Sequence, residues 1–246
     1  MILFLIGCGD YVTLRDAFEG ATDPLVVQAS YVGVEALPEG LDLGSSDWAK
    51  GSAARVFVAE TGSVGDLGRA PISDASVAFE GANSAVSLRT VTAGTWEANA
   101  GDGLSWSPGD DALFTIERDG EHILMMSMPA SPVLDLPQQL SSGDPLIVDI
   151  EGQAFDNLLV VVIRLADGET VYDSMPTDIN DLFTLTHAAG ELATEVPAST
   201  FAEPGAYAVG VAGLVNGDSD NYQAVNLALS ALTSGSMRFS ALTVHP

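Results

Sequence analysis

The clearest candidate for chemistry is a loop of oxygen-bearing side chains near the end of the chain. Asn216, Asp218 and Asp220 alternate there with small residues. Carboxylate and amide oxygens at alternate loop positions are the ligands that Ca²⁺ prefers, but an EF-hand also needs a glutamate at its twelfth position, which here is Leu227. The loop therefore either binds calcium through these three side chains or is a solvated turn between strands. No other cofactor is expected.

The residue types that serve most often in catalysis do not form a recognisable motif. None of the three histidines, His122, His187 and His245, has a partner at zinc-ligand spacing. The Gly-x-Ser-x-Gly turn of hydrolases is missing, and residues 61–65 come close but lack the first glycine. We therefore predict a protein that is not an enzyme and has no catalytic residues. The enzymatic alternative is a hydrolase with two dispersed carboxylates held across its substrate.

Three tryptophans offer a different kind of chemistry. Trp48, Trp96 and Trp106 could form an aromatic platform for a sugar, because their rings combine a large apolar area with a polar group. Trp96 and Trp106 fall in predicted strands of one domain, which favours a place in its core. A carbohydrate-binding or adhesion protein is the alternative that this set keeps open.

The charge balance excludes one class of partner. The chain has 34 acidic and 8 basic residues, and its net charge is −26. A surface this negative repels nucleic acid, which demands a basic face. The excess charge is explained by the solubility of a secreted protein, by adaptation to a salty habitat, or by calcium affinity.

The only cysteine lies close to the start of the chain, at Cys8. The apolar run before it is far shorter than the ~20 residues that span a bilayer. Residues Leu5-Ile6-Gly7-Cys8 resemble the lipobox of bacterial lipoproteins, which implies a signal peptide that ends before Cys8 and an acyl anchor on Cys8 in the lipid bilayer. Residues 1–8 would then be the signal peptide and lipidated cysteine, and residues 9–24 a tether. The alternative is a buried first strand with an unmodified thiol.

Residues 25–128 contain short runs that alternate apolar and polar residues between turns. Such runs are typical of a β-sandwich or barrel. The segment 71–96 also resembles the carboxypeptidase-regulatory, transthyretin-like family, through Pro71, Ile72, Ala75, Val77 and Phe79 and then Thr90 or Thr92, Gly94 and Trp96. The resemblance implies a small seven-stranded sandwich that carries no catalytic residues.

Residues 129–145 divide the chain in this interpretation. They include Pro129, Pro132, Pro137 and Pro145. Proline lacks the backbone donor that a central strand needs. We therefore predict that this segment is a proline-rich linker between two domains.

Residues 146–246 are expected to form the second sandwich. Leu158–Leu165 reads as a buried strand, and Pro204, Gly205, Tyr207, Val209 and Val211 resemble the start of strand F in the immunoglobulin/fibronectin type III family. The resemblance implies that the Tyr207 hydroxyl bonds to the backbone of the preceding corner. An ordinary turn and strand with a half-buried tyrosine is the alternative.

Together these features predict an all-β protein with two tandem β-sandwich domains, transthyretin-like and then immunoglobulin/fibronectin-like. The function they favour is that of a non-catalytic binding or scaffolding lipoprotein. We expect it to lie outside the cytoplasm, anchored through Cys8 to the outer membrane or cell surface. Its binding partner would be a protein or a glycan.

Overall fold

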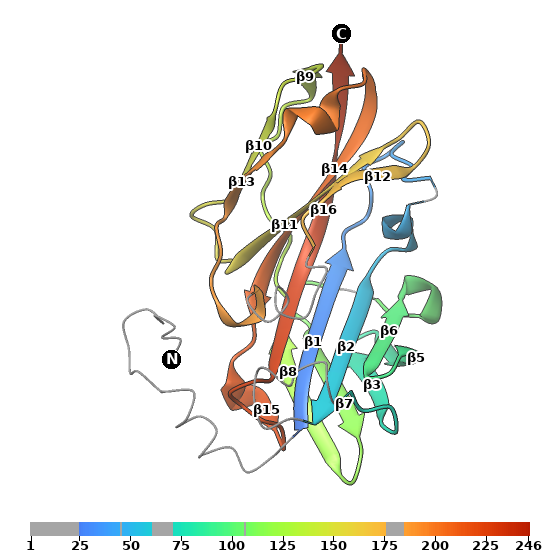
Figure 1. Ribbon diagram of the computed structural model, residues 1–246, viewed down its shortest axis with the longest axis vertical. Coiled ribbons are helices and arrows are strands. Elements are labelled where there is room, and N and C mark those ends of the chain that lie inside the picture. The colour runs from blue at the N-terminus through green and yellow to red at the C-terminus, as the bar shows by residue number, and fades with distance from the viewer. Residues whose placement is uncertain (1–24, 45, 61–70, 106, 176–184) are drawn as a thin grey trace.

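The computed structural model describes residues 25–44, 46–60, 71–105, 107–175 and 185–246 (Figure 1). Cys8, the tether 9–24 and Trp106 lie outside the described residues. The described chain is built almost entirely from strands, which confirms the predicted all-β class. Its helical elements include four short 3₁₀ turns, η1 (Asp47–Lys50), η3 (Ala100–Asp102), η4 (Ala198–Phe201) and η5 (Ser219–Asn221).

A nine-stranded sheet runs the length of the molecule. Its strands are β1 (Leu25–Val34), β2 (Ala53–Glu60), β5 (Arg89–Thr92), β6 (Thr95–Asn99), β9 (Gln139–Ser141), β11 (Asn157–Arg164), β12 (Glu169–Asp173), β14 (Gly205–Asn216) and β16 (Ala231–His245). The order is β12-β11-β14-β16-β1-β2-β6-β5, and β9 pairs with β16 beside this path. Strands β1, β2, β11 and β14 are rich in valine, which suits a half-buried pleated surface.

Two smaller sheets cover the ends of the large one. The first has the strands β3 (Ser76–Gly81), β4 (Ser84–Ser87), β7 (Asp111–Glu117), β8 (Glu121–Ser127) and β15 (Tyr222–Gln223) in the order β15-β8-β7-β3-β4. The second pairs β10 (Leu146–Asp149) with β13 (Ala193–Val196). The five-stranded sheet closes the lower sandwich in Figure 1, and the pair β10–β13 closes the upper one.

The two sandwiches share strands, so they do not follow one another as separate domains. The first half of β16 pairs in parallel with β1, from Gln28 opposite Ala231 to Val34 opposite Met237. Strand β15 pairs with β8 of the lower sandwich. The expected sequential division at residues 129–145 is therefore corrected, because the chain returns to the lower sandwich after β14. The sequence did not reveal this, because strand pairing across two hundred residues leaves no local pattern.

Three clusters of buried hydrophobic residues reflect this sharing of strands. The core of the lower sandwich contains Phe79 and Trp96, and also Tyr222, Val225 and Leu232 from the end of the chain. A second core fills the upper sandwich between the large sheet and β10–β13. A third cluster covers the opposite face of β11, β14 and β16. Both faces of these strands are thus buried, which explains why Leu158–Ile163 reads as one continuous apolar run.

The proline-rich segment 129–145 packs against the upper sandwich instead of joining two bodies loosely. Leu134, Leu136 and Leu140 contact the second core, and Pro132 is buried. Residues 139–141 form β9, which pairs in parallel with the end of β16. The prolines keep the rest of the segment out of the sheet, but its leucines still bury apolar surface, so the linker interpretation is corrected.

Candidate functional site

The corner before β14 centres on Tyr207. Its ring is 1% exposed and meets the Phe201 ring edge-on, with centroids 5.6 Å apart. Its hydroxyl donates a hydrogen bond of 2.7 Å to the Glu203 carbonyl, four residues back along the chain. This is the contact that defines a tyrosine corner in immunoglobulin-like sandwiches. Burial raises the pKa of the Tyr207 hydroxyl, so it remains a neutral donor.

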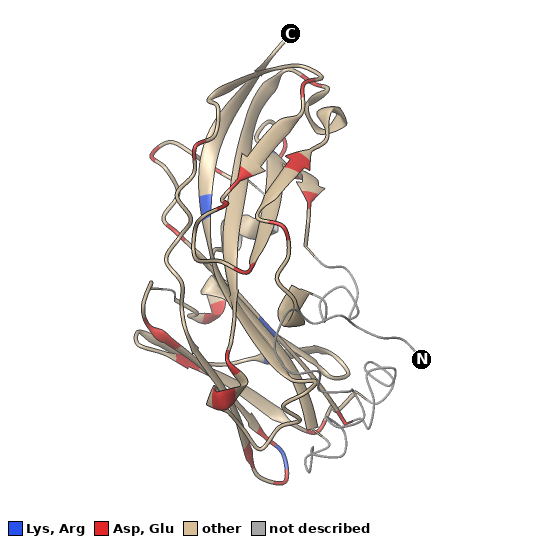
Figure 2. Cartoon of the chain, turned by 90° about the vertical axis from the view of Figure 1, so that its left-hand side faces the viewer, with Lys and Arg blue, Asp and Glu red and all other residues tan. Residues whose placement is uncertain are grey.

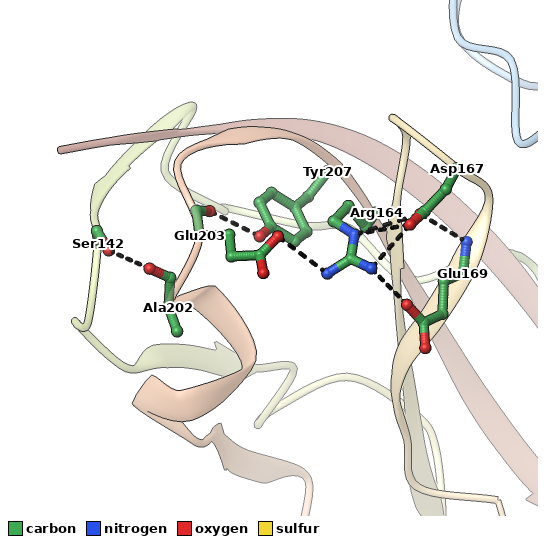
Figure 3. A network of polar contacts seen from close by, with 7 residues as sticks. All are labelled: Ser142, Arg164, Asp167, Glu169, Ala202, Glu203 and Tyr207. Carbon is green, nitrogen blue, oxygen red and sulfur yellow. Dashed lines mark hydrogen bonds and ion pairs between the residues drawn. The ribbon is translucent and has the colours of Figure 1, made fainter.

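A single arginine gathers three carboxylates beside this corner (Figure 3). Arg164 ends β11 and contacts both Asp167 oxygens, with Nη2 2.8 Å from Oδ2. It also bonds to Glu169 on β12 and reaches Glu203 at 3.3 Å. Asp167 in turn accepts the Glu169 backbone N–H at 3.1 Å. The guanidinium therefore ties the β11–β12 turn to the corner that Tyr207 closes.

The pKa shifts in this network suit a structural role, in which charged groups hold the chain together, and do not suit proton transfer. Hydrogen bonding to Asp167 raises the pKa of Arg164, and the same contact lowers the pKa of Asp167. Each shift moves the pKa of its group further from neutral pH, whereas a general acid or base works best with a pKa near the operating pH. One positive charge against three negative ones also leaves a surplus of negative charge at this end of the molecule.

The loop after β9 completes the end of the upper sandwich. The Ser142 hydroxyl donates to the Ala202 carbonyl at 2.7 Å, and the Ser142 backbone N–H donates to the His245 carbonyl at 2.6 Å. The Gly143 backbone N–H donates to the Phe201 carbonyl at 3.1 Å. The corner, this loop and the last strand thus hold one another. They lie at the end opposite the start of β1 (Figure 1).

The tyrosine corner gives a direct prediction for Tyr207→Phe. The substitution keeps the ring and removes only the hydroxyl, so the Glu203 carbonyl loses its donor. We expect a loss of about 1–2 kcal/mol in the free energy of unfolding. Urea denaturation measures this loss, with Tyr172→Phe as the control at a half-buried tyrosine; an unchanged midpoint for Tyr207→Phe would show that the corner contributes nothing.

The candidate calcium loop is engaged in contacts with the chain itself. The Asn216 Oδ1 accepts a hydrogen bond of 2.9 Å from the Thr233 hydroxyl. Asp218 precedes η5 and accepts the Asp220 backbone N–H at 3.0 Å. Within the described part of the chain, no group of three or more histidine, cysteine, aspartate or glutamate side chains is placed to hold a metal. Calcium binding by Asn216, Asp218 and Asp220 stays a prediction.

A chelator experiment separates the two interpretations of this loop. Because Asp218 acts as a cap, we expect Asp218→Ala to lower stability by about 1 kcal/mol, equally with and without EDTA. Thermal melting of both proteins, with and without EDTA, checks this. A fall in the melting temperature of the unmutated chain on chelation, absent in Asp218→Ala, would instead establish calcium binding.

The remaining candidate residues are dispersed. His122 contacts the Ala224 and Arg118 carbonyls, and His187 contacts the Thr186 hydroxyl at 2.9 Å. His245 is exposed at the end of β16. Trp96 is 1% exposed in the lower core, as the sequence favoured.

Trp48 is half-buried against the third cluster, so it does not share a surface with Trp96. Two open hollows also contain pairs of acids. Glu60 and Asp74 line one beside Arg118, and Glu151 and Glu191 line the other. No helix in the described ranges is long and apolar enough to cross a membrane.

Comparison with known proteins adds little to this geometry. No family model matches the sequence, and no curated protein is similar to it. Among solved structures, the BSP domain of a biofilm-associated protein is 10% identical over 90% of this chain and 30% of that chain, with a TM-score of 0.27. Tp47, the 47-kilodalton lipoprotein of Treponema pallidum, is 11% identical over 88% and 52%, with a TM-score of 0.33.

The FN1–FN3 domains of chicken CNTN1 are 11% identical over 79% of this chain and 63% of that chain, with a TM-score of 0.23. The chain therefore spans about a third and about half of the first two structures. Scores this low place the chain in no family. The transthyretin-like and lipobox resemblances accordingly stay predictions.

Proposed function

We propose that this protein is a non-catalytic binding or scaffolding module, held outside the cytoplasm by an acyl chain on Cys8. The observation that carries the proposal is the shape of the described chain. Strand β1 begins at one end of an elongated body, β16 runs through both sandwiches, and β16 ends near the other end (Figure 1). A strand that both sandwiches share opposes bending between them, which suits a scaffolding role.

The charges of the described surface agree with this role. All five arginines in the described ranges contact carboxylates: Arg55, Arg89, Arg118, Arg164 and Arg238. The remaining carboxylates are spread over both sandwiches (Figure 2). Dispersed negative charge keeps an extracellular protein soluble and monomeric. The two hollows that contain paired acids are open to solvent, whereas a hydrolase would hold its substrate in a cleft.

Anchoring through Cys8 is tested on protein from the native host. Mass spectrometry of the N-terminal peptide is expected to find an acylated cysteine at position 8, and detergent extraction is expected to be needed for release. The variant Cys8→Ser should appear in the soluble fraction with an unchanged melting temperature. An intact Met1, or an unmodified cysteine in membrane-free protein, would overturn the anchoring.

The carbohydrate-binding alternative has less support from the two tryptophans that the structure describes, because Trp96 lies in the lower core and Trp48 is half-buried. Stacking on a sugar needs an exposed ring face. Tryptophan fluorescence titrated with soluble glycans tests it, and a saturable shift that Trp48→Ala abolishes would establish sugar binding.

A further inference from the structure

The outward face of the five-stranded sheet has an apolar centre. On β7 and β8 the residues Leu113 and Met125 lie directly opposite one another, and Ile123 lies two residues from Met125 on the same face. The neighbours Ala112, Phe114, Leu124 and Met126 point the other way into the core. Met125 is 37% exposed, while Leu113 and Ile123 are half-buried. Aliphatic side chains thus occupy the middle of a solvent-facing sheet.

Carboxylates surround this centre on the same face. Glu117 and Glu121 lie directly opposite one another at one end of β7 and β8, and Asp111 lies at the other end. Glu80 on β3 lies opposite Leu113. All four are exposed. We call the outward side chains of β3, β7 and β8 the acidic face.

The acidic face has no cation of its own. The outward positions of β3, β7 and β8 include neither lysine nor arginine. Arg118 follows Glu117 in the chain, but its guanidinium contacts Glu60 at 3.2 Å and Asp74 at 3.0 Å, away from this face. Like charges directly opposite in a sheet destabilise it. The pair Glu117–Glu121 therefore carries a cost that a cationic ligand would relieve.

We propose that the acidic face docks an extended basic segment of a partner protein. Along β7 the outward residues 111, 113, 115 and 117 read acid, apolar, threonine, acid. The two acids are six residues apart, or about 20 Å in a strand. A complementary strand has the pattern Lys-x-Leu-x-Leu-x-Lys. Both lysines and both leucines then lie on one face, and the two lysines are as far apart as the two acids.

A chelated metal ion is a poorer occupant than such a segment. The carboxylates are spread along about 20 Å, and no described group of three acids is close enough to hold an ion. A segment with separated cations matches this spacing, and its leucines cover Leu113 and Met125. Burial of that apolar area adds a contribution that pure charge attraction lacks.

The experiment uses the full chain with Cys8→Ser and a fluorescent peptide that contains Lys-Thr-Leu-Thr-Leu-Thr-Lys. Fluorescence anisotropy measures binding at low ionic strength, where surface charge is least screened. We expect saturable binding, and binding at least about fivefold weaker for a peptide with threonine in place of both leucines, since each leucine buries apolar area.

Two double variants locate the contact. Glu117→Gln with Glu121→Gln removes the charge pair, and Leu113→Thr with Met125→Thr removes the apolar centre without changing the charge. Each is expected to weaken binding at least about fivefold, which corresponds to roughly 1 kcal/mol. The double variant Glu117→Gln with Glu121→Gln should also have a higher melting temperature than the unmutated chain, because it removes the repulsion between the two carboxylates. Glu39→Gln with Glu195→Gln is the matched control for charge, and it should change affinity less than twofold.

Equal weakening by the control pair, equal binding of the leucine-free peptide, or no binding at all would overturn the proposal. It rests on the proposed binding function and names its partner class. The outcomes can be told apart, because the peptide assay contains no acyl chain. Binding without acylated Cys8 in the native protein would reject the anchoring alone, and acylation without peptide binding would reject the acidic face alone.

Discussion

Neither residues 1–138 nor residues 139–246 are expected to fold when produced alone. The first fragment loses the half of β16 that pairs with β1, and with it the buried Tyr222 and Leu232. The second loses β1, whose Val32 belongs to the third cluster. Removal of single large core side chains costs about 3–5 kcal/mol. Several such losses together exceed the 5–15 kcal/mol that stabilises a typical domain.

Nuclear magnetic resonance of each fragment checks this expectation, since an unfolded chain gives poorly dispersed amide signals. The full chain should melt in one cooperative transition. Mixing the two fragments should restore dispersed signals, because all strands are then present. A flexible insertion at Gly40, an exposed turn, is the control and should leave the fold intact. A cooperative melt of residues 1–138 alone would contradict the shared-strand arrangement.

A rise in salt from about 10 mM to about 1 M is expected to raise the melting temperature by at least roughly 10 °C, because the Debye length falls from about 30 Å to about 3 Å. The chain carries a net charge of −26, and the described arginines are already engaged in ion pairs. Self-repulsion of a highly charged protein destabilises its compact state. Screening removes this repulsion, and the ion pairs lost at the surface contribute little.

Scanning calorimetry across a salt series measures this effect. Sodium and potassium chloride should act equally, since screening depends on ionic strength and not on ion identity. The variant Glu117→Gln with Glu121→Gln should show a smaller salt dependence than the unmutated chain. A melting temperature independent of salt would favour solubility over salt adaptation as the reason for the acidic composition.

Local patterns predicted the strands with good agreement. The alternation of Val77 and Phe79 with small or polar neighbours matches β3, and the predicted buried strand Leu158–Leu165 matches β11. The corner around Tyr207 was visible from the Pro-Gly-x-Tyr spacing, because that motif is local. The Arg164 network was missed, although Asp167 and Glu169 stand three and five residues away. In a chain so rich in acids, such proximity is not distinctive.

The domain division failed for a physical reason. The prolines of 129–145 do exclude most of that segment from a sheet, but proline does not indicate whether a segment separates two cores. Leu134 and Leu136 are partly buried there, because apolar side chains beside a core pack against it.

The sequence by itself determined the all-β class, most strand positions and the strongly negative surface, since these depend on residue type and on neighbours within a few positions. The tertiary structure decided that β16 belongs to both sandwiches and that Arg164 links the β11–β12 turn to the corner before β14. It also placed Glu117, Glu121, Leu113 and Met125 on one face. Strand register and pairing between distant segments set these features, because only the closing of the sheet brings such side chains together.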